Sequence, residues 1–206
     1  MAIIEVEGCI AKHMISINLT FDDGPGPSTA RLLDVLRDAR FAATFFVLGK
    51  HAQAQPALLR RMVEEGHVIG NHTWSHAHDG ELSDQLLEEG IAATDSVIHA
   101  AFEEARIAVP GIIPLRLPYG THSGDTRLRV LESLGRSHVG WTSLFHDWAQ
   151  PAQDVDGLVD AMCAHIADQI CCGEDAVLCL HDASPRAEER EATVDAIERW
   201  LALRSH

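Results

Sequence analysis

The chain has 206 residues, of which 46% are hydrophobic and 23% are charged, and its formal net charge at neutral pH is −15. This length and composition are typical of a folded globular protein, and we expect residues 1–206 to form a single domain. The excess of negative charge argues against nucleic acid or an anionic membrane as a partner. No apolar run approaches the ~20 residues that a transmembrane helix needs.

The N-terminal segment and the cysteines bear on location and redox state. Glu5 and Glu7 stand where a secretory signal peptide needs a basic start and an apolar stretch, so we expect a cytoplasmic protein. The cysteines are odd in number and lack the spacing of a zinc site. We therefore expect free, mostly buried thiols at Cys9, Cys163, Cys171, Cys172 and Cys179.

Short apolar or β-branched runs alternate with helical patterns along the chain. In chain order we expect a strand at 15–21, a helix at 28–39, a strand at 42–49, a helix at 56–66, a strand at 67–71, a helix at 83–105, a strand at 111–118, a helix at 124–135, a strand at 137–142, a helix at 155–170, a strand at 176–182 and a helix at 189–203. Ser28 is a suitable N-cap, whereas Pro114 and Pro118 should make their strand irregular. Residues 2–8 also have the alternation of a strand.

This alternation of strands and helices predicts a parallel sheet that is covered by helices. Six such units fit either a doubly wound sheet or a barrel. The periodicity alone does not choose between the two.

Polar side chains follow five of the expected strands, at the points where the strands end. In parallel α/β architectures the catalytic groups gather at the carboxyl ends of the strands. The residues at these ends are Asp22 and Asp23, then Asn71, His72 and His76, then Arg116 and Tyr119, then Asp147 and Trp148, and finally His181 and Asp182. Their recurrence predicts an active site at this edge.

Each of these residues, taken singly, also has a simple structural explanation. The Asp-Asp-Gly-Pro stretch that begins at Asp22 is typical of a turn. His72 and His76 are four residues apart and would face the same way on a helical turn, but the chain contains 13 histidines. Arg116 and His181 could be ordinary surface and core residues. The combination of all of them favours a catalytic site.

Two imidazoles and a carboxylate, with one position left open for water, are the donor set of a catalytic zinc ion. His72, His76 and one of the paired aspartates fit this description. The second aspartate would then accept a proton from water as a general base, and a protonated His181 could give a proton to a leaving group. The chemistry indicated is metal-assisted hydrolysis of an acyl bond.

Five short motifs in this order resemble the signature of a known family. They are "TFDDGP" from Thr20, "HTWSH" from His72, "RLPY" from Arg116, "HDW" from His146 and "LCLHD" from Leu178. This series resembles the polysaccharide deacetylases, which share the NodB-homology domain and form carbohydrate esterase family four. The resemblance implies a distorted (β/α) barrel, a divalent metal that is usually zinc but in some members cobalt or nickel, and hydrolysis of N-acetyl groups from N-acetylglucosamine units.

Carried over position by position, the resemblance also implies a role for each motif residue. Asp23, His72 and His76 would hold the metal, Asp22 would be the base, and Arg116 would pair with it. The Tyr119 N–H would stabilise the oxyanion, and His181, oriented by Asp147, would be the general acid. Trp148, Leu178 and Pro118 would contact the substrate, with Leu178 in the pocket for the acetyl methyl group.

The chain departs from the family in two places. The fourth motif usually begins with an acidic residue, but Leu144 stands there, which leaves the groove wall and the substrate less defined. Members commonly end with a further strand after the last helix, whereas this chain stops soon after "WLAL". The barrel is therefore expected to be incompletely closed or to borrow the N-terminal residues.

Three interpretations of the function remain open. The first is N-deacetylation of a short or soluble amino sugar, a substrate class that the absence of an appended carbohydrate-binding domain and an export signal favours. The second is cleavage of an O-acetyl ester or a non-sugar amide by the same site. The third is a carbohydrate-binding relative without catalysis. The sugar and the oligomeric state are not readable from the sequence.

Overall fold

The structure, a computed structural model, describes residues 2–5, 14–149 and 154–204. A six-stranded sheet forms its centre, with the order β4-β3-β2-β6-β5 and with β1 attached to β2. The pairs along this order are parallel, whereas β1 and β2 are antiparallel. The strands are β1 Ala2–Glu5, β2 Met14–Asp22, β3 Thr44–Val47, β4 Val68–Asn71, β5 Ser143–Leu144 and β6 Ala176–His181.

The register of β2 brings the ends of three strands to one edge of the sheet. Asp22, the last residue of β2, lies opposite Phe46 of β3 and opposite His181 of β6. Val47 of β3 in turn lies opposite Asn71, the last residue of β4. Asp22, His181 and the residues after Asn71 therefore start from neighbouring positions, as the parallel arrangement predicts.

The sheet does not close into a barrel. Leu115 forms isolated parallel bridges to Asn71 and to His138, so the chain beyond β4 only partly continues the sheet. The expected strand at 111–118 is reduced to the bridges of Leu115, because Pro114 and Pro118 lack the N–H groups that a ladder needs. The expected strand at 137–142 is also wrong: there the structure has a bridge at His138, and β5 follows at Ser143–Leu144. The expected N-terminal strand exists as β1, but it pairs with β2 instead of closing the gap.

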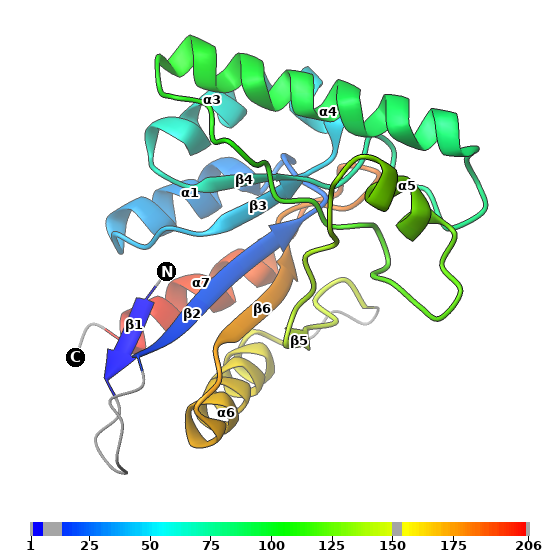
Figure 1. Ribbon diagram of the computed structural model, residues 1–206. Helices are drawn as coiled ribbons and strands as arrows, with labels where there is room; N and C mark the ends of the chain where they lie inside the picture. Colours follow the sequence, from blue (N-terminus) through cyan, green and yellow to red (C-terminus); the bar gives the residue numbers. More distant parts are fainter. Residues whose placement is uncertain (1, 6–13, 150–153, 205–206) are drawn as a thin grey trace.

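Seven helices are present in the described residues, and those around the sheet bury its two faces (Figure 1). Most match the expected positions, whereas the short α2 was not expected. Ser28 is buried but makes no cap bond to α1, because its hydroxyl oxygen accepts the N–H of Arg190 while the hydroxyl donates to Glu191 at the start of α7. The helices are α1 Thr29–Asp38, α2 Gly49–Ala54, α3 Pro56–Glu64, α4 Asp84–Ala105, α5 Arg127–Ser133, α6 Val155–Cys172 and α7 Glu191–Leu203.

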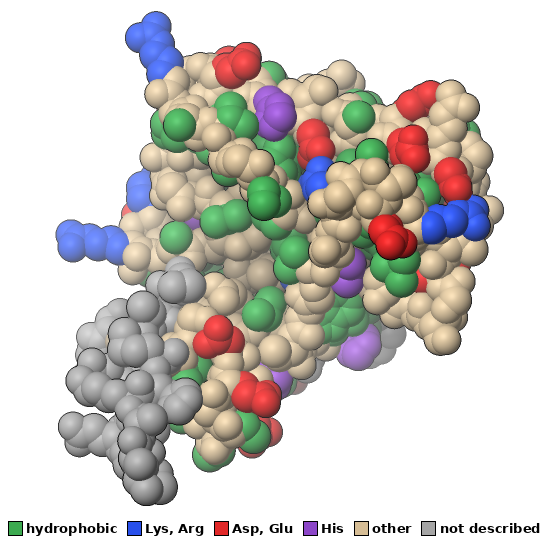
Figure 2. Space-filling model, in the orientation of Figure 1, with side chains coloured by type: hydrophobic (Ala, Val, Ile, Leu, Met, Phe, Trp, Pro, Cys, Tyr) green, Lys and Arg blue, Asp and Glu red, His purple; other side chains and the backbone are tan. Residues whose placement is uncertain are grey.

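The core forms between the sheet and these helices. Its members are mainly leucine, isoleucine, valine and phenylalanine, including Phe21, Phe45 and Leu178, which are fully buried. Each such side chain contributes about 1.5–3 kcal/mol through burial. On the visible face, acidic side chains are scattered over several elements (Figure 2). This distribution fits the net charge of −15.

The cysteines of the described residues are free thiols, as expected, but most of them are not buried. Cys163, Cys171 and Cys172 are exposed on α6, and Cys179 on β6 is buried. Cys9 lies outside the described residues. Within the part of the chain that the structure describes, no helix is both long enough and apolar enough to cross a membrane.

Candidate active site

Two adjacent aspartates at the end of β2 face one cavity. Neighbouring residues of a regular strand point to opposite faces of the sheet. Asp23 leaves the strand with a positive φ of 74°, and both carboxylates line the same cavity. Asp22 is 3% exposed and Asp23 is 4% exposed. Because the backbone turns at Asp23, the carboxylates of Asp22 and Asp23 can face the same cavity instead of opposite faces of the sheet.

The two histidines follow β4 on an irregular segment, not on a helical turn as the sequence suggested. The Asn71 side chain holds this segment, because its Oδ1 accepts the N–H of Thr73 while its Nδ2 donates to Asp95 and to a carbonyl of α4. Thr73 and His76 both adopt positive φ. The bends bring the imidazoles of His72 and His76 to a centroid separation of 5.2 Å.

Asp23, His72 and His76 form a group of possible metal ligands whose donor atoms lie within 4.8 Å of one another. The Oδ1 atom of Asp23 is 3.1 Å from Nε2 of His76 and 3.5 Å from Nε2 of His72. It is buried and accepts no hydrogen bond from the described residues. A buried carboxylate oxygen without a donor, facing two imidazole nitrogens, fits a bound cation.

The protonation states of this group also fit a cation. Burial lowers the pKa of His72 to about 4 and that of His76 to about 3, so both rings are neutral, as metal ligation requires. Burial raises the pKa of Asp23 to about 7, and the negative charges of Asp22 and Asp182 add to this effect. Nδ1 of His72 lies 2.8 Å from the Arg116 carbonyl, which orients the ring and leaves Nε2 for the metal.

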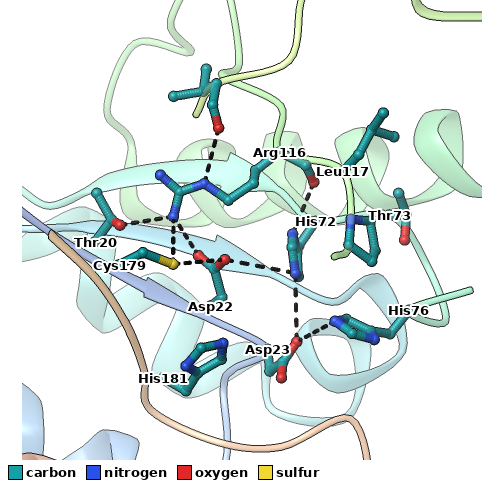
Figure 3. A network of polar contacts seen from close by, with 12 residues as sticks. Thr20, Asp22, Asp23, His72, Thr73, His76, Arg116, Leu117, Cys179 and His181 are labelled. Carbon is teal, nitrogen blue, oxygen red and sulfur yellow. Dashed lines mark hydrogen bonds and ion pairs between the residues drawn. The ribbon is translucent and has the colours of Figure 1, made fainter. Parts of the chain in front are cut away.

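Arg116 holds Asp22 in place (Figure 3). The guanidinium is fully buried, and its Nη1 donates to Oδ1 of Asp22 at 2.8 Å and to the Thr20 hydroxyl at 2.8 Å. Its Nε and Nη2 donate to the carbonyls of Val139 and Gly140. Burial raises the pKa of Asp22, but the positive charge and hydrogen bond of Arg116, together with the charges of His72 and His181, outweigh burial and hold this pKa below its usual value. Asp22 is therefore an ionised, fixed proton acceptor.

His181 and Asp147 form a second pair, on the side of β6. Nδ1 of His181 lies 2.8 Å from Oδ1 of Asp147, and Oδ2 of Asp147 accepts the His181 N–H and the Thr193 hydroxyl. Burial lowers the pKa of His181, but the charge and hydrogen bond of Asp147 outweigh it and raise this pKa to about 9. The imidazole is therefore charged at neutral pH and can donate a proton.

These groups surround one cavity of about 580 Å³. Asp22, Asp23, His72, His76 and His181 line it together with Leu117, Tyr119, Trp141, Leu144, Trp148, Cys179 and residues of the loop from Ser184 to Arg190. Arg116 and Asp147 do not line the cavity themselves. Arg116 contacts Asp22, and Asp147 contacts His181. The structure thus brings together the residues that the sequence singled out for metal, base and acid.

Leu178 and Pro118 lie elsewhere, which corrects their prediction as substrate contacts. Leu178 is fully buried in the hydrophobic core, because successive residues of β6 alternate between the two faces of the sheet. Cys179 and His181 share the face that borders the cavity. Pro118 lines a separate small cavity beside His78, and its carbonyl accepts a hydrogen bond from Arg127.

Aromatic rings border the cavity on two sides. Tyr119 is 57% exposed and stacks on His78 at a centroid distance of 3.6 Å, while Trp148 is 38% exposed and lies edge-on to His181 at 4.8 Å. Tyr119 has a positive φ of 62°. Exposed rings of this kind provide flat apolar surface on which a ligand can pack.

The sequence reasoning missed Cys179, Trp141 and the loop after β6. Cys179 could have been found from the strand alternation, because it lies two residues before His181 and must share its face. The loop carries no pattern that would place it beside the cavity. Its residues Arg186, Glu188 and Arg190 complete the rim.

Comparison with known proteins gives matches over most of the chain. The sequence profile described as "Polysaccharide deacetylase" matches residues 11–139. A chitooligosaccharide deacetylase of Bradyrhizobium is 39% identical over 198 residues, covering 92% of this chain and 80% of the relative. A peptidoglycan-N-acetylglucosamine deacetylase of Bacillus cereus is 32% identical over 190 residues, covering 90% of this chain and 79% of the relative.

A solved structure is also similar over most of the chain. A family 4 carbohydrate esterase from Streptomyces lividans, in complex with acetate, superposes with a TM-score of 0.73 at 29% identity. The match covers 92% of this chain and 88% of the esterase.

Proposed function

The chain belongs to the polysaccharide deacetylase family, and we propose that it removes the N-acetyl group from N-acetylglucosamine units of an oligo- or polysaccharide, releasing acetate. The observation that carries this proposal is the arrangement around the cavity. The possible metal ligands Asp23, His72 and His76 line one cavity. The ionised carboxylate of Asp22 and the charged imidazole of His181 line the same cavity. Hydrolysis of an amide requires an activated water and a proton for the departing amine, and this arrangement supplies a group for each.

Members of this family depend on a divalent metal, and Asp23, His72 and His76 would hold it here. Two imidazoles and one carboxylate suit Zn²⁺, with Co²⁺ and Ni²⁺ as ions of similar preference. When bound, the cation would polarise the acetamide carbonyl and lower the pKa of a water molecule.

The side chains of the protein would carry out the proton transfers. Asp22, held by Arg116, accepts a proton from the attacking water. His181 donates a proton to the sugar nitrogen as the carbon–nitrogen bond breaks, and Asp147 keeps its ring charged and oriented. The N–H of Tyr119 has no acceptor among the described residues and is available to the developing oxyanion. The aromatic ring of Trp148 would contact the sugar.

Acetate release from a soluble N-acetylchitooligosaccharide tests the proposal. The protein is assayed after chelation, after addition of Zn²⁺ or Co²⁺, and after addition of Ca²⁺ as a cation that prefers oxygen ligands. We expect activity to return with Zn²⁺ or Co²⁺ but not with Ca²⁺. A parallel assay on an O-acetylated xylan separates amide from ester cleavage. Bound metal with no acetate from the N-acetylated sugar would refute the proposal.

Replacing Asp147 with asparagine should shift the alkaline limb of the pH–rate profile to lower pH. The general acid is active while His181 is protonated, so activity in the parent protein should fall as pH rises through about 9. Without the Asp147 charge, burial dominates and lowers the pKa of His181, by about 1–3 units. The measurement is kcat against pH with the soluble oligosaccharide.

Thr193→Val is the matched control for this experiment. It removes a hydroxyl that donates to the same carboxylate but leaves the Asp147 charge in place. We expect a smaller displacement of the limb in this variant. An alkaline limb that stays in place in Asp147→Asn would exclude His181 as the general acid.

A further inference from the structure

A second set of possible metal ligands lies beside the first. A carboxylate oxygen of Asp22, Sγ of Cys179 and a ring nitrogen of His181 lie within 4.8 Å of one another. Asp22 ends β2, and the other two residues occupy the cavity face of the neighbouring β6, where Asp22 pairs with His181. All three line the cavity, and the close-up view shows them grouped on one side of Asp23 (Figure 3).

We propose that Asp22, Cys179 and His181 form a second, inhibitory cation site that takes a thiophilic divalent ion such as Zn²⁺ or Cd²⁺. Sulfur, imidazole and carboxylate donors are the usual ligands of Zn²⁺, which holds them in a tetrahedron with donors roughly 3.5 Å apart. Sγ of Cys179 already lies 3.5 Å from Oδ2 of Asp22, and the three donor atoms lie within 4.8 Å of one another. All three residues line the cavity, so an ion and a water molecule could reach them.

The histidine of this set is oriented for ligation. Its Nδ1 bonds to Oδ1 of Asp147 at 2.8 Å, which leaves Nε2 as the free nitrogen. A carboxylate on the far nitrogen is the common partner of metal-binding histidines, because it fixes the ring and strengthens the donor. The geometry that prepares His181 to donate a proton also prepares it to bind a cation once that proton is lost.

The sulfur makes the site selective. Sγ of Cys179 donates to Oδ2 of Asp22 at 3.5 Å and accepts from Nη1 of Arg116 at 3.4 Å. Burial raises the pKa of this thiol, so it stays protonated without a cation. When the ion binds, the S–H bond of Cys179 and the Nε2–H bond of His181 break, bonds from sulfur and from Nε2 to the metal form, and both protons pass to solvent. Mg²⁺ and Ca²⁺, which prefer oxygen ligands, would not compete.

Arg116 keeps a positive charge beside the thiolate that such binding creates. Its guanidinium contacts the sulfur and Asp22, so it stabilises a thiolate after the proton leaves. The two anionic donors then balance the divalent ion. The site therefore differs from the group of Asp23, His72 and His76, which has only nitrogen and oxygen donors.

The inhibitory consequence rests on the proposed function. An ion in this second site binds both the base Asp22 and the acid His181, so both proton transfers stop while the first site keeps its metal. The protein would be active with one equivalent of Zn²⁺ and inhibited when a second equivalent binds. Free zinc would thereby limit the activity.

Cadmium titration tests the site independently of turnover. The full chain with Cys9, Cys163, Cys171 and Cys172 changed to serine is loaded with one equivalent of Zn²⁺ and titrated with Cd²⁺. We expect an ultraviolet sulfur-to-cadmium charge-transfer band that saturates at one equivalent. The first site cannot produce it, because it contains no sulfur. The matched control adds Cys179→Ser, or Cys179→Ala, and should show no band.

Two further measurements decide the role of the site. His181→Ala should weaken the affinity for Cd²⁺, measured from the charge-transfer band, at least tenfold. Cys179→Ser should raise the Zn²⁺ concentration that half-inhibits acetate release at least tenfold. Absence of the band in the parent variant would refute the site, and a band without inhibition would refute its regulatory role. If no acetate is released under any metal condition, the proposed function fails but the cadmium band still decides the site.

Discussion

Asp22→Asn is expected to lower kcat for deacetylation by about 10²–10⁴-fold while the protein still binds its catalytic metal. This loss corresponds to about 3–5 kcal/mol in the activation barrier. The amide has nearly the shape of the carboxylate and can still accept a hydrogen bond from Arg116, so the fold should persist. It cannot accept a proton from water. The measurements are acetate release and metal content after dialysis.

Asp182→Asn is the matched control for this variant. Asp182 is also a buried aspartate near the site, but it does not line the cavity, and its side chain accepts a hydrogen bond from Thr29. Burial raises the pKa of Asp182 to about 7, so a neutral amide replaces a group that is already partly protonated. We expect a change in kcat of less than about tenfold, because the group is outside the proton-transfer path.

The metal content separates the two possible roles of Asp22. Retained metal with lost turnover identifies Asp22 as the base and leaves Asp23 as the carboxylate ligand. Loss of metal together with activity would instead identify Asp22 as a ligand. Substantial activity in the variant, above about a tenth of the parent value, would show that another group accepts the proton.

Much of the site could be predicted because its catalytic side chains lie at the carboxyl ends of parallel strands. The strand before Asp22 alternates apolar residues with Ser16, Asn18 and Thr20, and the strand before His181 is a continuous apolar run. Parallel pairing then brings their carboxyl ends together. The positions of Asp22 and His181 followed from this rule without any knowledge of distances. The rule also placed His72 correctly, although the segment after β4 is not helical.

Backbone conformation set the limit of prediction. Asp23, His76 and Tyr119 all have positive φ, which residues other than glycine rarely adopt. No local sequence pattern predicts this conformation. Leu178 was carried over from the family motif as a substrate contact, whereas the alternation of β6, with His181 facing the cavity, puts it on the opposite face. Residues 111–118 read as a strand by composition, but only Leu115 of them forms a bridge.

Arg116→Ala is expected to give the largest loss of stability among single changes in the site, about 3–5 kcal/mol, because it leaves a buried charge without its partner. The side chain is 0% exposed and donates to Asp22, Thr20, Val139 and Gly140, and its guanidinium lies 4.0 Å from the Phe46 ring centroid. Total stabilities of domains are only about 5–15 kcal/mol, so the variant should be marginal. Urea unfolding measures the change.

Arg129→Ala is the surface control. Arg129 pairs with Asp84 at 2.8 Å, but the two side chains are 64% and 48% exposed, and water screens pairs of this kind so that they contribute little to stability. Comparing the stability losses of the two variants therefore separates the effect of burying an ion pair from the effect of the ion pair alone. Equal losses in the two variants would contradict the assignment of a buried, structural ion pair to Arg116.

A double-mutant cycle shows how much of the stability lost in Arg116→Ala comes from leaving the carboxylate of Asp22 buried without a partner. In Arg116→Ala with Asp22→Asn, the remaining group is a neutral amide, so the free energy of unfolding should recover by about 1–3 kcal/mol relative to Arg116→Ala alone. Arg116→Lys should recover less, because an ammonium keeps the charge but cannot reach the Val139 and Gly140 carbonyls in the planar geometry of the guanidinium. Additive losses in the cycle would mean that Arg116 stabilises the fold mainly through these carbonyls and the Phe46 ring. The pairing with Asp22 would then serve catalysis alone.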